Sequence, residues 1–287
     1  MVPSTLVSRS LHLFGVFLSL TGLIFVALRI QSYAGQIDFS RLNESIWFLI
    51  GLLSILYGTS NLLLARAWWY LLVFWGVAVR WTWAVRIYGL SQIAKYVPGN
   101  IFHLAGRQTF GLAAGLPAKA FAKSVFWELV LLSLSGILFL LFVLPLYLPW
   151  TSAMGSILLF SITLLALAFL LRKTASFQVA AALLLQVAFL FLSGLMFFFL
   201  IRAASGDVEL PPFSTVCGAF VTAWLAGFVT PGAPAGVGIR EMVLLFLLEG
   251  PIPEADLLLA VLLGRGVTVL GDLCYCLMSI ALKPQNE

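Results

Sequence analysis

The sequence predicts an all-α, polytopic transmembrane helix bundle with two Pro-Gly-broken, re-entrant segments arranged as an inverted repeat. Of its 287 residues, 62% are hydrophobic and 9% are charged, and the mean hydropathy is +1.09. Soluble domains carry about 25% charged residues. Apolar runs long enough to cross a bilayer recur along the chain, and two Pro-Gly pairs interrupt such runs. We therefore expect one transmembrane domain over residues 1–287.

About 20 apolar residues span the hydrocarbon core of a bilayer, so hydropathy places the elements in order. It predicts helices at residues 11–28, 46–64, 81–97, 124–144, 152–171, 179–201, 213–229 and 257–282. Residues 65–77 mix Arg66 with three Trp and one Tyr, which is typical of a segment at the membrane surface. Residues 242–248 form an apolar run too short to cross alone.

The basic residues are scattered singly between apolar runs, which favours membrane loops over a nucleic-acid interface despite the net charge of +5. With the N-terminus inside, eight basic residues face the cytoplasm and three face outward. The inner group is Arg9, Arg66, Arg80, Lys119, Lys123, Arg172, Lys173 and Lys283, and the outer group is Arg29, Arg41 and Arg202. The positive-inside rule then predicts N-in and C-in, and a bacterial inner membrane is the default location.

Two polar stretches interrupt the apolar pattern. They read KYVPGNIFHLAGR at residues 95–107 and TPGAPAGVGIRE at residues 230–241. Each places an arginine nine residues after its proline, and the second stretch lies 133 residues after the first. Paired Gly/Pro interruptions in two halves of opposite orientation are typical of inverted-repeat transporters. The predicted halves are about 65–145 and 179–283; a chance match in a chain with 24 glycines is the alternative.

Each break is expected to form part of an anion site. Proline removes a backbone N–H, and the freed backbone groups need protein or trapped water around them. A helix that restarts after the break directs its N-terminus into the membrane, where an anion is stabilised. Arg107 and Arg240 add full positive charges, so the two breaks together could hold a lipid phosphate. The alternative is that each Pro-Gly only kinks a helix while each arginine reaches a headgroup.

Further polar residues within the apolar spans complete the candidate site. Glu128, Glu241, Arg265 and Asp272 should face the bundle and pair, because an unpaired charge is costly there. We expect Glu128 to pair with Arg107 or Arg265, and Glu241 to pair with a basic residue of the first break. Purely structural ion pairs are the alternative, and Asp272 could simply lie near the inner interface. Glu128 and Asp272 are the candidates for proton coupling.

His103 and Asn100 lie in the first break itself. Asn100 is expected to cap the restarted helix. His103 is expected to bind phosphate or shuttle a proton, with a packing role as the alternative. No metal site is expected, because no Cys, Asp or Glu lies at ligand spacing around either histidine.

With these residues identified, the sequence resembles the lysylphosphatidylglycerol synthase transmembrane, or flippase-like, family. The resemblance runs from about residue 65 to the C-terminus. The residues that carry it are Pro98, Gly99, Arg107, Glu128, Pro231, Gly232, Gly236, Gly238, Arg240, Glu241 and Arg265. It implies a polytopic bundle that moves anionic or aminoacylated lipids, or acts in polyprenyl-phosphate glycan or hopanoid pathways. The chain lacks the soluble aminoacyl-transferase domain of the bifunctional synthases, so lysine transfer from tRNA is not expected.

The function predicted first is a lipid transporter, or flippase, that moves a phospholipid or a polyprenyl-phosphate-linked sugar between leaflets of the cell-envelope membrane. No cofactor is expected, and no nucleotide-binding GxxxxGK[ST] motif occurs. The alternative is a membrane enzyme or an accessory subunit in lipid-linked glycan assembly. The predicted partner is a membrane lipid and not nucleic acid, and the sequence leaves a membrane-protein partner or a homo-oligomer open.

Overall fold

The structure, a computed structural model, describes residues 28, 31, 43–96, 102–148, 150–206, 208–231 and 233–282. These residues are almost entirely helical, and no strand longer than the isolated bridge between Glu249 and Ile252 occurs among them. The helix predicted at residues 11–28 lies outside the described residues apart from Leu28.

Five helical segments are long and apolar enough to cross a membrane. They are α2 (Glu44–Phe74), α5 (Ala118–Leu138) with its 3-10 extension η3 (Phe139–Phe142), α7 (Ala153–Thr174), α8 (Phe177–Ser205) and α11 (Glu254–Ala281). Side-chain oxygens of Asn43, Ser152 and Ser176 cap the first turns of α2, α7 and α8, which satisfies otherwise unpaired backbone N–H groups. The one-turn helix α6 (Leu144–Tyr147) leads from η3 toward α7. The fold is therefore compatible with a helical membrane bundle.

Two pairs of shorter helices lie between the long ones. The first pair is α3 (Trp81–Gln92), extended by η2 (Ile93–Tyr96), and α4 (Phe102–Ala113); the second is α9 (Phe213–Val229) and α10 (Ile239–Leu248), joined through η4 (Pro234–Gly236). Helices α3 and α4 have 12 residues each, about 18 Å at 1.5 Å per residue. The hydrocarbon core is about 30 Å thick, so neither helix crosses it alone. The predicted span at residues 81–97 is thus too long, since its regular helix ends at Gln92.

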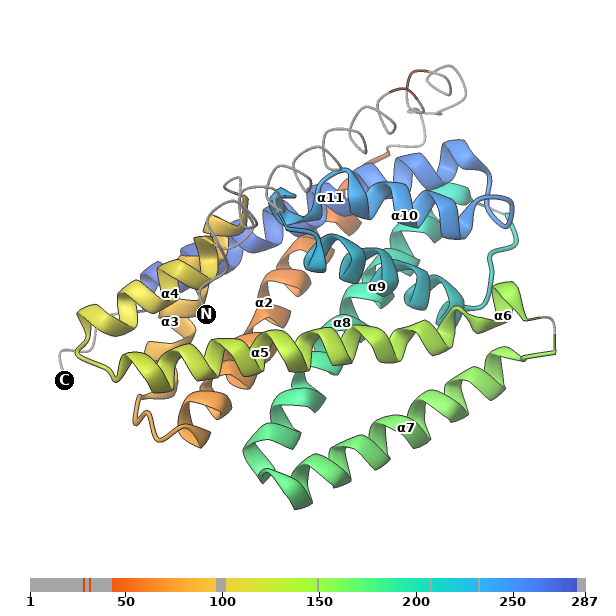
Figure 1. Ribbon diagram of the computed structural model, residues 1–287. Coiled ribbons are helices and arrows are strands. Elements are labelled where there is room, and N and C mark those ends of the chain that lie inside the picture. Colours follow the sequence, from red (N-terminus) through yellow and green to blue (C-terminus); the bar gives the residue numbers. More distant parts are fainter. Residues whose placement is uncertain are drawn as a thin grey trace, which may run out of the picture.

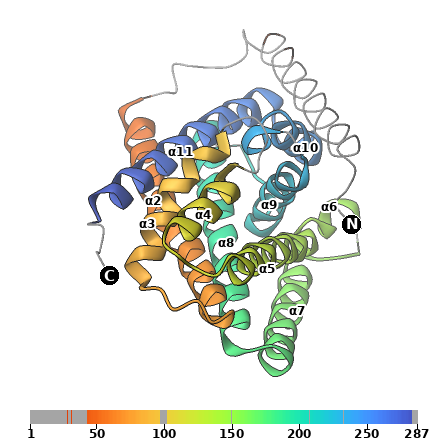
Figure 2. The same ribbon diagram turned by 60° about the vertical axis from the view of Figure 1, so that its left-hand side comes forward.

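The same order of elements occurs twice along the chain. A long helix, a pair of short helices and a second long helix follow one another as α2, α3–α4, α5 and again as α8, α9–α10, α11. Figures 1 and 2 show that α2 and α8 lie side by side and run in opposite directions. Helices α5 and α11 also run in opposite directions, but they lie farther apart. Helix α7 lies at the edge of the bundle in both views.

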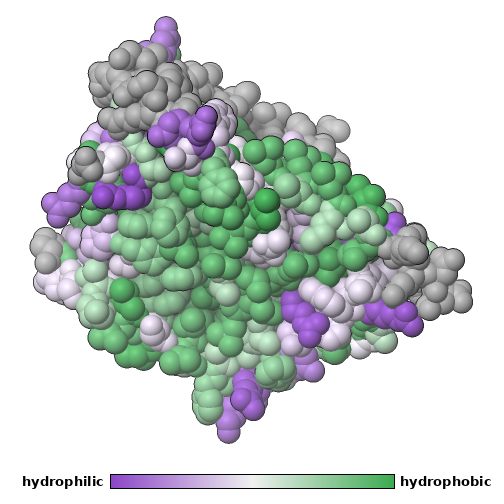
Figure 3. All heavy atoms as spheres, turned by 180° about the vertical axis from the view of Figure 1, so that it is seen from behind, coloured by the Kyte–Doolittle hydropathy of each residue, from purple (hydrophilic) through white to green (hydrophobic). Residues whose placement is uncertain are grey.

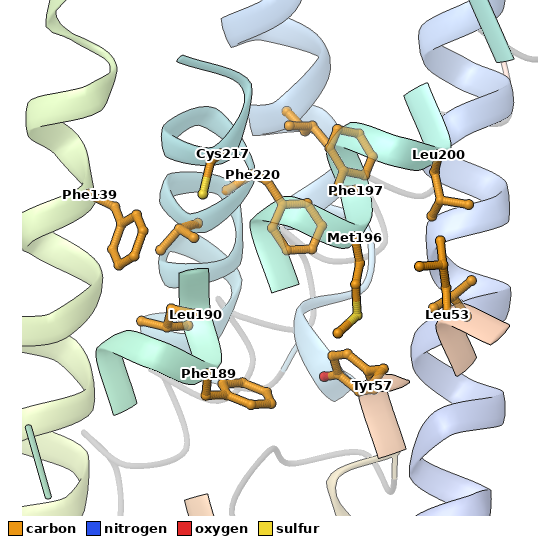
Figure 4. Close-up of a cluster of buried hydrophobic side chains, with 14 of the residues drawn as sticks. Leu53, Tyr57, Phe139, Phe189, Leu190, Met196, Phe197, Leu200, Cys217 and Phe220 are labelled. Carbon is orange, nitrogen blue, oxygen red and sulfur yellow. The ribbon is translucent and has the colours of Figure 1, made fainter. Parts of the chain in front are cut away.

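The core packs around α2, α8 and α9. Figure 4 shows Tyr57 of α2 beside Phe189 of α8, and Phe197 of α8 beside Phe220 of α9. The ring centroids are 5.7 Å apart in the first pair and 4.9 Å apart in the second. The outer surface is also apolar: Figure 3 shows a face covered mainly by hydrophobic side chains, with hydrophilic ones gathered at its margins. This distribution suits a molecule surrounded by lipid.

Residues 65–77, which the sequence predicts at the membrane surface, do not form an element of their own. Helix α2 continues without interruption to Phe74, and Trp68 and Leu71 are fully buried. Some residues in this last part of α2, including Arg66 and Tyr70, are half-exposed. Trp68 contacts Phe121 of α5 with ring centroids 5.4 Å apart, because its large apolar ring fills the space between three helices.

Substituting Gly271 by Ala is expected to destabilise the crossing of α2 and α11. A Cβ atom at Gly271 would lie 2.7 Å from the carbonyl oxygen of Ser54, and overpacking of this kind costs about 1–3 kcal/mol. Gly266→Ala in the same helix is the matched control, since a Cβ atom there meets nothing within 4 Å. Unfolding midpoints in detergent should fall for Gly271→Ala alone; equal midpoints would show that the two helices are not in close contact.

Candidate functional site

The second break has a backbone that few residue types allow. Ala235, Gly236 and Gly238 have positive φ angles of 48°, 70° and 85°, a region that is costly for residues with a Cβ atom. A Cβ atom at Gly236 would also lie 2.8 Å from the Cα of Gly227, so two glycines let the break approach α9. Helix α10 restarts only at Ile239, which is later than the Pro-Gly pair suggests and places Arg240 in its first turn.

Glu241 holds this restart in place. Its Oε2 accepts a 2.7 Å hydrogen bond from the N–H of Gly238, and its Oε1 pairs with Nε of Arg265 on α11. Nη1 of Arg265 also donates to the carbonyl oxygen of Ala235 over 3.1 Å. The predicted pairing of Glu241 with a basic residue of the first break is therefore wrong. The actual partner is only 24 residues away in the sequence, because α11 folds back beside α10.

The first break leads into α4, which carries Arg107. Nη1 of Arg107 lies 2.6 Å from Oε2 and 2.9 Å from Oε1 of Glu128 on α5, which confirms one of the two partners predicted for Glu128. The hydroxyl of Tyr88 donates to Oε1 of the same carboxylate over 3.0 Å. Arg107 is 2% exposed and Glu128 is 3% exposed, so the pair is almost fully desolvated and couples α3, α4 and α5.

A third ion pair joins the first break to α11. Nζ of Lys95 in η2 lies 2.7 Å from Oδ2 of Asp272, and the hydroxyl of Tyr96 donates to the same oxygen. Asp272 is 0% exposed, and its Oδ1 has no hydrogen-bond partner among the described residues. Lys95 therefore supplies the charge that Asp272 needs.

These residues surround one internal cavity of about 90 Å³. Its charged lining residues are Lys95, Arg107, Glu128, Arg240, Arg265 and Asp272. Its wall also contains Gly236, Gln92 and aromatic side chains, among them Tyr57, Phe189 and Trp224. The volume is well below the roughly 300–1,000 Å³ of sites that enclose a whole small molecule. The cavity can therefore hold a group of phosphate size, but not an acyl chain.

Arg240 differs from the other cations of the cavity. Its guanidinium carbon lies 4.4 Å from the ring centroid of Phe220, and the side chain is 8% exposed. Lys95, Arg107 and Arg265 each have a carboxylate partner, whereas none of the described carboxylates lies within 4.0 Å of Arg240. Within the described part of the chain, four cations thus face three carboxylates, and the unbalanced positive charge belongs to Arg240.

The remaining predicted residues divide into three groups. Pro231 is exposed at the end of α9, outside the cavity lining, and Gly238 precedes α10. His103 lies in α4, but its side chain is outside the description. Pro98, Gly99, Asn100 and Gly232 lie outside the described residues. The structure therefore brings together Arg107, Glu128, Gly236, Arg240, Arg265 and Asp272, with Glu241 attached through Arg265.

Several cavity residues carry little signal in the sequence. Tyr88 and Gln92 on α3 look like ordinary interior polar residues, yet Gln92 donates a 3.0 Å hydrogen bond to Asn61. Tyr88 holds Glu128. The need of a buried Asp272 for a cation makes Lys95 one of several candidates in the sequence, since each buried charge requires a partner.

Glu128→Gln is expected to lower the free energy of unfolding by about 3–5 kcal/mol, because it leaves the Arg107 guanidinium buried without its carboxylate. Glu209→Gln is the control, since Glu209 is exposed in the loop before α9. The double substitution Arg107→Met with Glu128→Leu should recover most of the loss. Denaturant titration in detergent measures all three variants, and full stability of Glu128→Gln would contradict a buried ion pair.

No protein-family model matches the sequence, and no curated protein matches it.

Proposed function

We propose that the protein is a membrane lipid transporter that moves a lipid with an anionic phosphate headgroup between leaflets. The single observation that carries this proposal is the unbalanced charge of Arg240 in a partly enclosed cavity with a mainly apolar wall. A desolvated cation without a carboxylate is costly, so the site is completed when an anion enters. The resemblance to the flippase-like family supports the same conclusion from the sequence.

The charge balance indicates the substrate class. Among the described residues at the cavity, each of three cations is neutralised by a carboxylate, and one positive charge is left. This balance matches a phosphodiester, which carries one negative charge, better than a phosphomonoester or a diphosphate. Phospholipids and polyprenyl-phosphate sugars both contain such a diester. The cavity of about 90 Å³ would receive the phosphate, while the apolar chains remain in the surrounding bilayer.

The proposed movement uses an inverted repeat. The repeated order of long and short helices, and the opposite directions of α2 and α8, support two halves that each contribute one re-entrant pair. Ion pairs tie both breaks to α11: Lys95 pairs with Asp272, and Glu241 pairs with Arg265. Rocking of the halves around this site would expose the phosphate to either side in turn. We place the protein in a bacterial inner membrane with both termini inside.

Reconstitution into liposomes tests the proposal. Headgroup-labelled phosphatidylglycerol and a polyprenyl-phosphate sugar serve as probes, and an impermeant quencher reports which leaflet holds the label. We expect faster exchange than in protein-free vesicles for at least one probe, with its mass unchanged. If neither probe moves, or if the lipid mass changes, the proposed function is wrong, and the second result would favour an enzyme.

A further inference from the structure

A second hollow lies outside the bundle core, between α7, α8 and the last part of α2. It has a volume of about 560 Å³ and is several times larger than the central cavity. Leu165, Phe169, Leu184 and Leu185 form its apolar part. The groove exists because α7 is only 11% buried along its most apolar stretch, and small residues such as Ala181 line α8 there.

The groove is polar at one end. Arg172 lies in the last turn of α7, and Arg66 of α2 lines the same hollow. Leu165 precedes Arg172 by seven residues, which is about 10 Å along a helix. The groove therefore combines a basic end with an apolar trough about two-thirds as long as one leaflet of the hydrocarbon core is thick.

The two arginines have no acidic partner among the described residues. Arg66 instead packs on aromatic rings, with its guanidinium carbon 4.2 Å from the centroid of Trp69 and 4.9 Å from that of Tyr70. Tyr70 in turn contacts Phe177 of α8, with centroids 6.1 Å apart. Aromatic rings beside cationic side chains are typical of the headgroup level of a membrane. Two positive charges held there are complementary to a phosphate.

We propose that this groove binds an anionic phospholipid of the surrounding leaflet, with its phosphate between Arg66 and Arg172 and one acyl chain along α7 and α8. Basic hollows between transmembrane helices are suited to such headgroups. The bound lipid fills the space that α7 leaves open and connects α7 to α2. This site is separate from the central cavity, since the two share no lining residue, and it does not depend on lipid transport.

Native mass spectrometry in detergent tests the proposal, with phosphatidylglycerol and phosphatidylcholine as probes. The wild-type protein should retain phosphatidylglycerol preferentially. Arg172→Gln should weaken that binding about fivefold, and the double substitution with Arg66→Gln about thirtyfold, at about 1 kcal/mol for each charge. Retention of phosphatidylcholine should not change. Arg66 also packs on the rings of Trp69 and Tyr70, so its replacement could prevent folding. In that case Arg172→Gln alone tests the proposal.

Two controls make the result specific. Lys119→Gln with Lys123→Gln removes two charges elsewhere and should keep the preference for phosphatidylglycerol. Ala181→Trp fills the trough and should reduce binding with both arginines in place. Equal loss in the lysine variant would mean unspecific attraction, and an unchanged Arg172→Gln variant would mean no site; either overturns the proposal. The proposal would also be overturned if cross-linking residues introduced at Leu165 and Leu184 joined two copies of the chain, since a protein would then occupy the groove. All these readouts measure binding, so they remain informative if no lipid moves in liposomes.

Discussion

Arg240→Gln is expected to reduce the rate of lipid exchange in liposomes by about 10–150-fold. The guanidinium supplies the unbalanced charge of the cavity, and a hydrogen bond to a charged group contributes about 1.5–3 kcal/mol. Glutamine keeps a polar side chain but removes the charge. The free energy of unfolding should not fall, because no described carboxylate loses a partner. The initial rate of exchange per reconstituted protein is the measurement.

Arg202→Gln is the matched control for that substitution. Arg202 is exposed near the end of α8, and its Nη1 donates to the carbonyl oxygen of Val208. Arg202 has the same charge as Arg240 but lies outside the cavity. The Arg202→Gln variant should therefore exchange lipid at the wild-type rate. If Arg240→Gln and Arg202→Gln moved lipid equally fast, Arg240 would have no part in binding the phosphate.

Hydropathy predicted several helices closely, although α2 continues ten residues beyond its predicted end at residue 64. The predicted helix at residues 213–229 coincides with α9, and the predicted helices at 152–171 and 257–282 differ from α7 and α11 by at most three residues at either end. An apolar run of this length has few other stable arrangements, because every backbone polar group must be paired within lipid. The fold class was therefore predictable from composition and run length alone.

The breaks were predictable in position but not in shape. The Pro-Gly pair at Pro231 indicates where α9 ends, whereas the restart of α10 at Ile239 depends on the close approach of Gly236 to Gly227. Ion-pair partners were predicted only in part for a similar reason. Glu128 with Arg107 was among the expected pairs, but Lys95 with Asp272 joins residues 177 positions apart in the sequence. Such pairing depends on how helices pack, which local sequence does not report.

The offset between the two breaks suggests why only one arginine is left unbalanced. Arg240 lies 133 residues after Arg107, and the residue 133 positions after Glu128 is Val261. Val261 is buried on α11 and lines the same small pocket as Arg240. If the proposed repeat holds, the first half has a carboxylate beside its arginine, whereas the second half has the isopropyl group of Val261 at the corresponding position.

Val261→Glu is therefore expected to neutralise Arg240 in the way that Glu128 neutralises Arg107. The new carboxylate would compete with the lipid phosphate, and the loss of one attractive charge should slow exchange at least about tenfold, which corresponds to about 1.4 kcal/mol. Val261→Gln has nearly the same size without the charge, and it should retain more of the exchange rate. The liposome assay measures both variants.

A stability measurement separates pairing from simple damage to the core. In the Arg240→Gln background, Val261→Glu would bury a carboxylate without its cation, which costs about 3–5 kcal/mol more than burying the pair. The double variant should therefore unfold at a lower denaturant concentration than Val261→Glu alone. If the two unfold alike while Val261→Glu still moves lipid at the wild-type rate, the carboxylate does not reach Arg240. The asymmetry between the halves would then not explain the unbalanced charge.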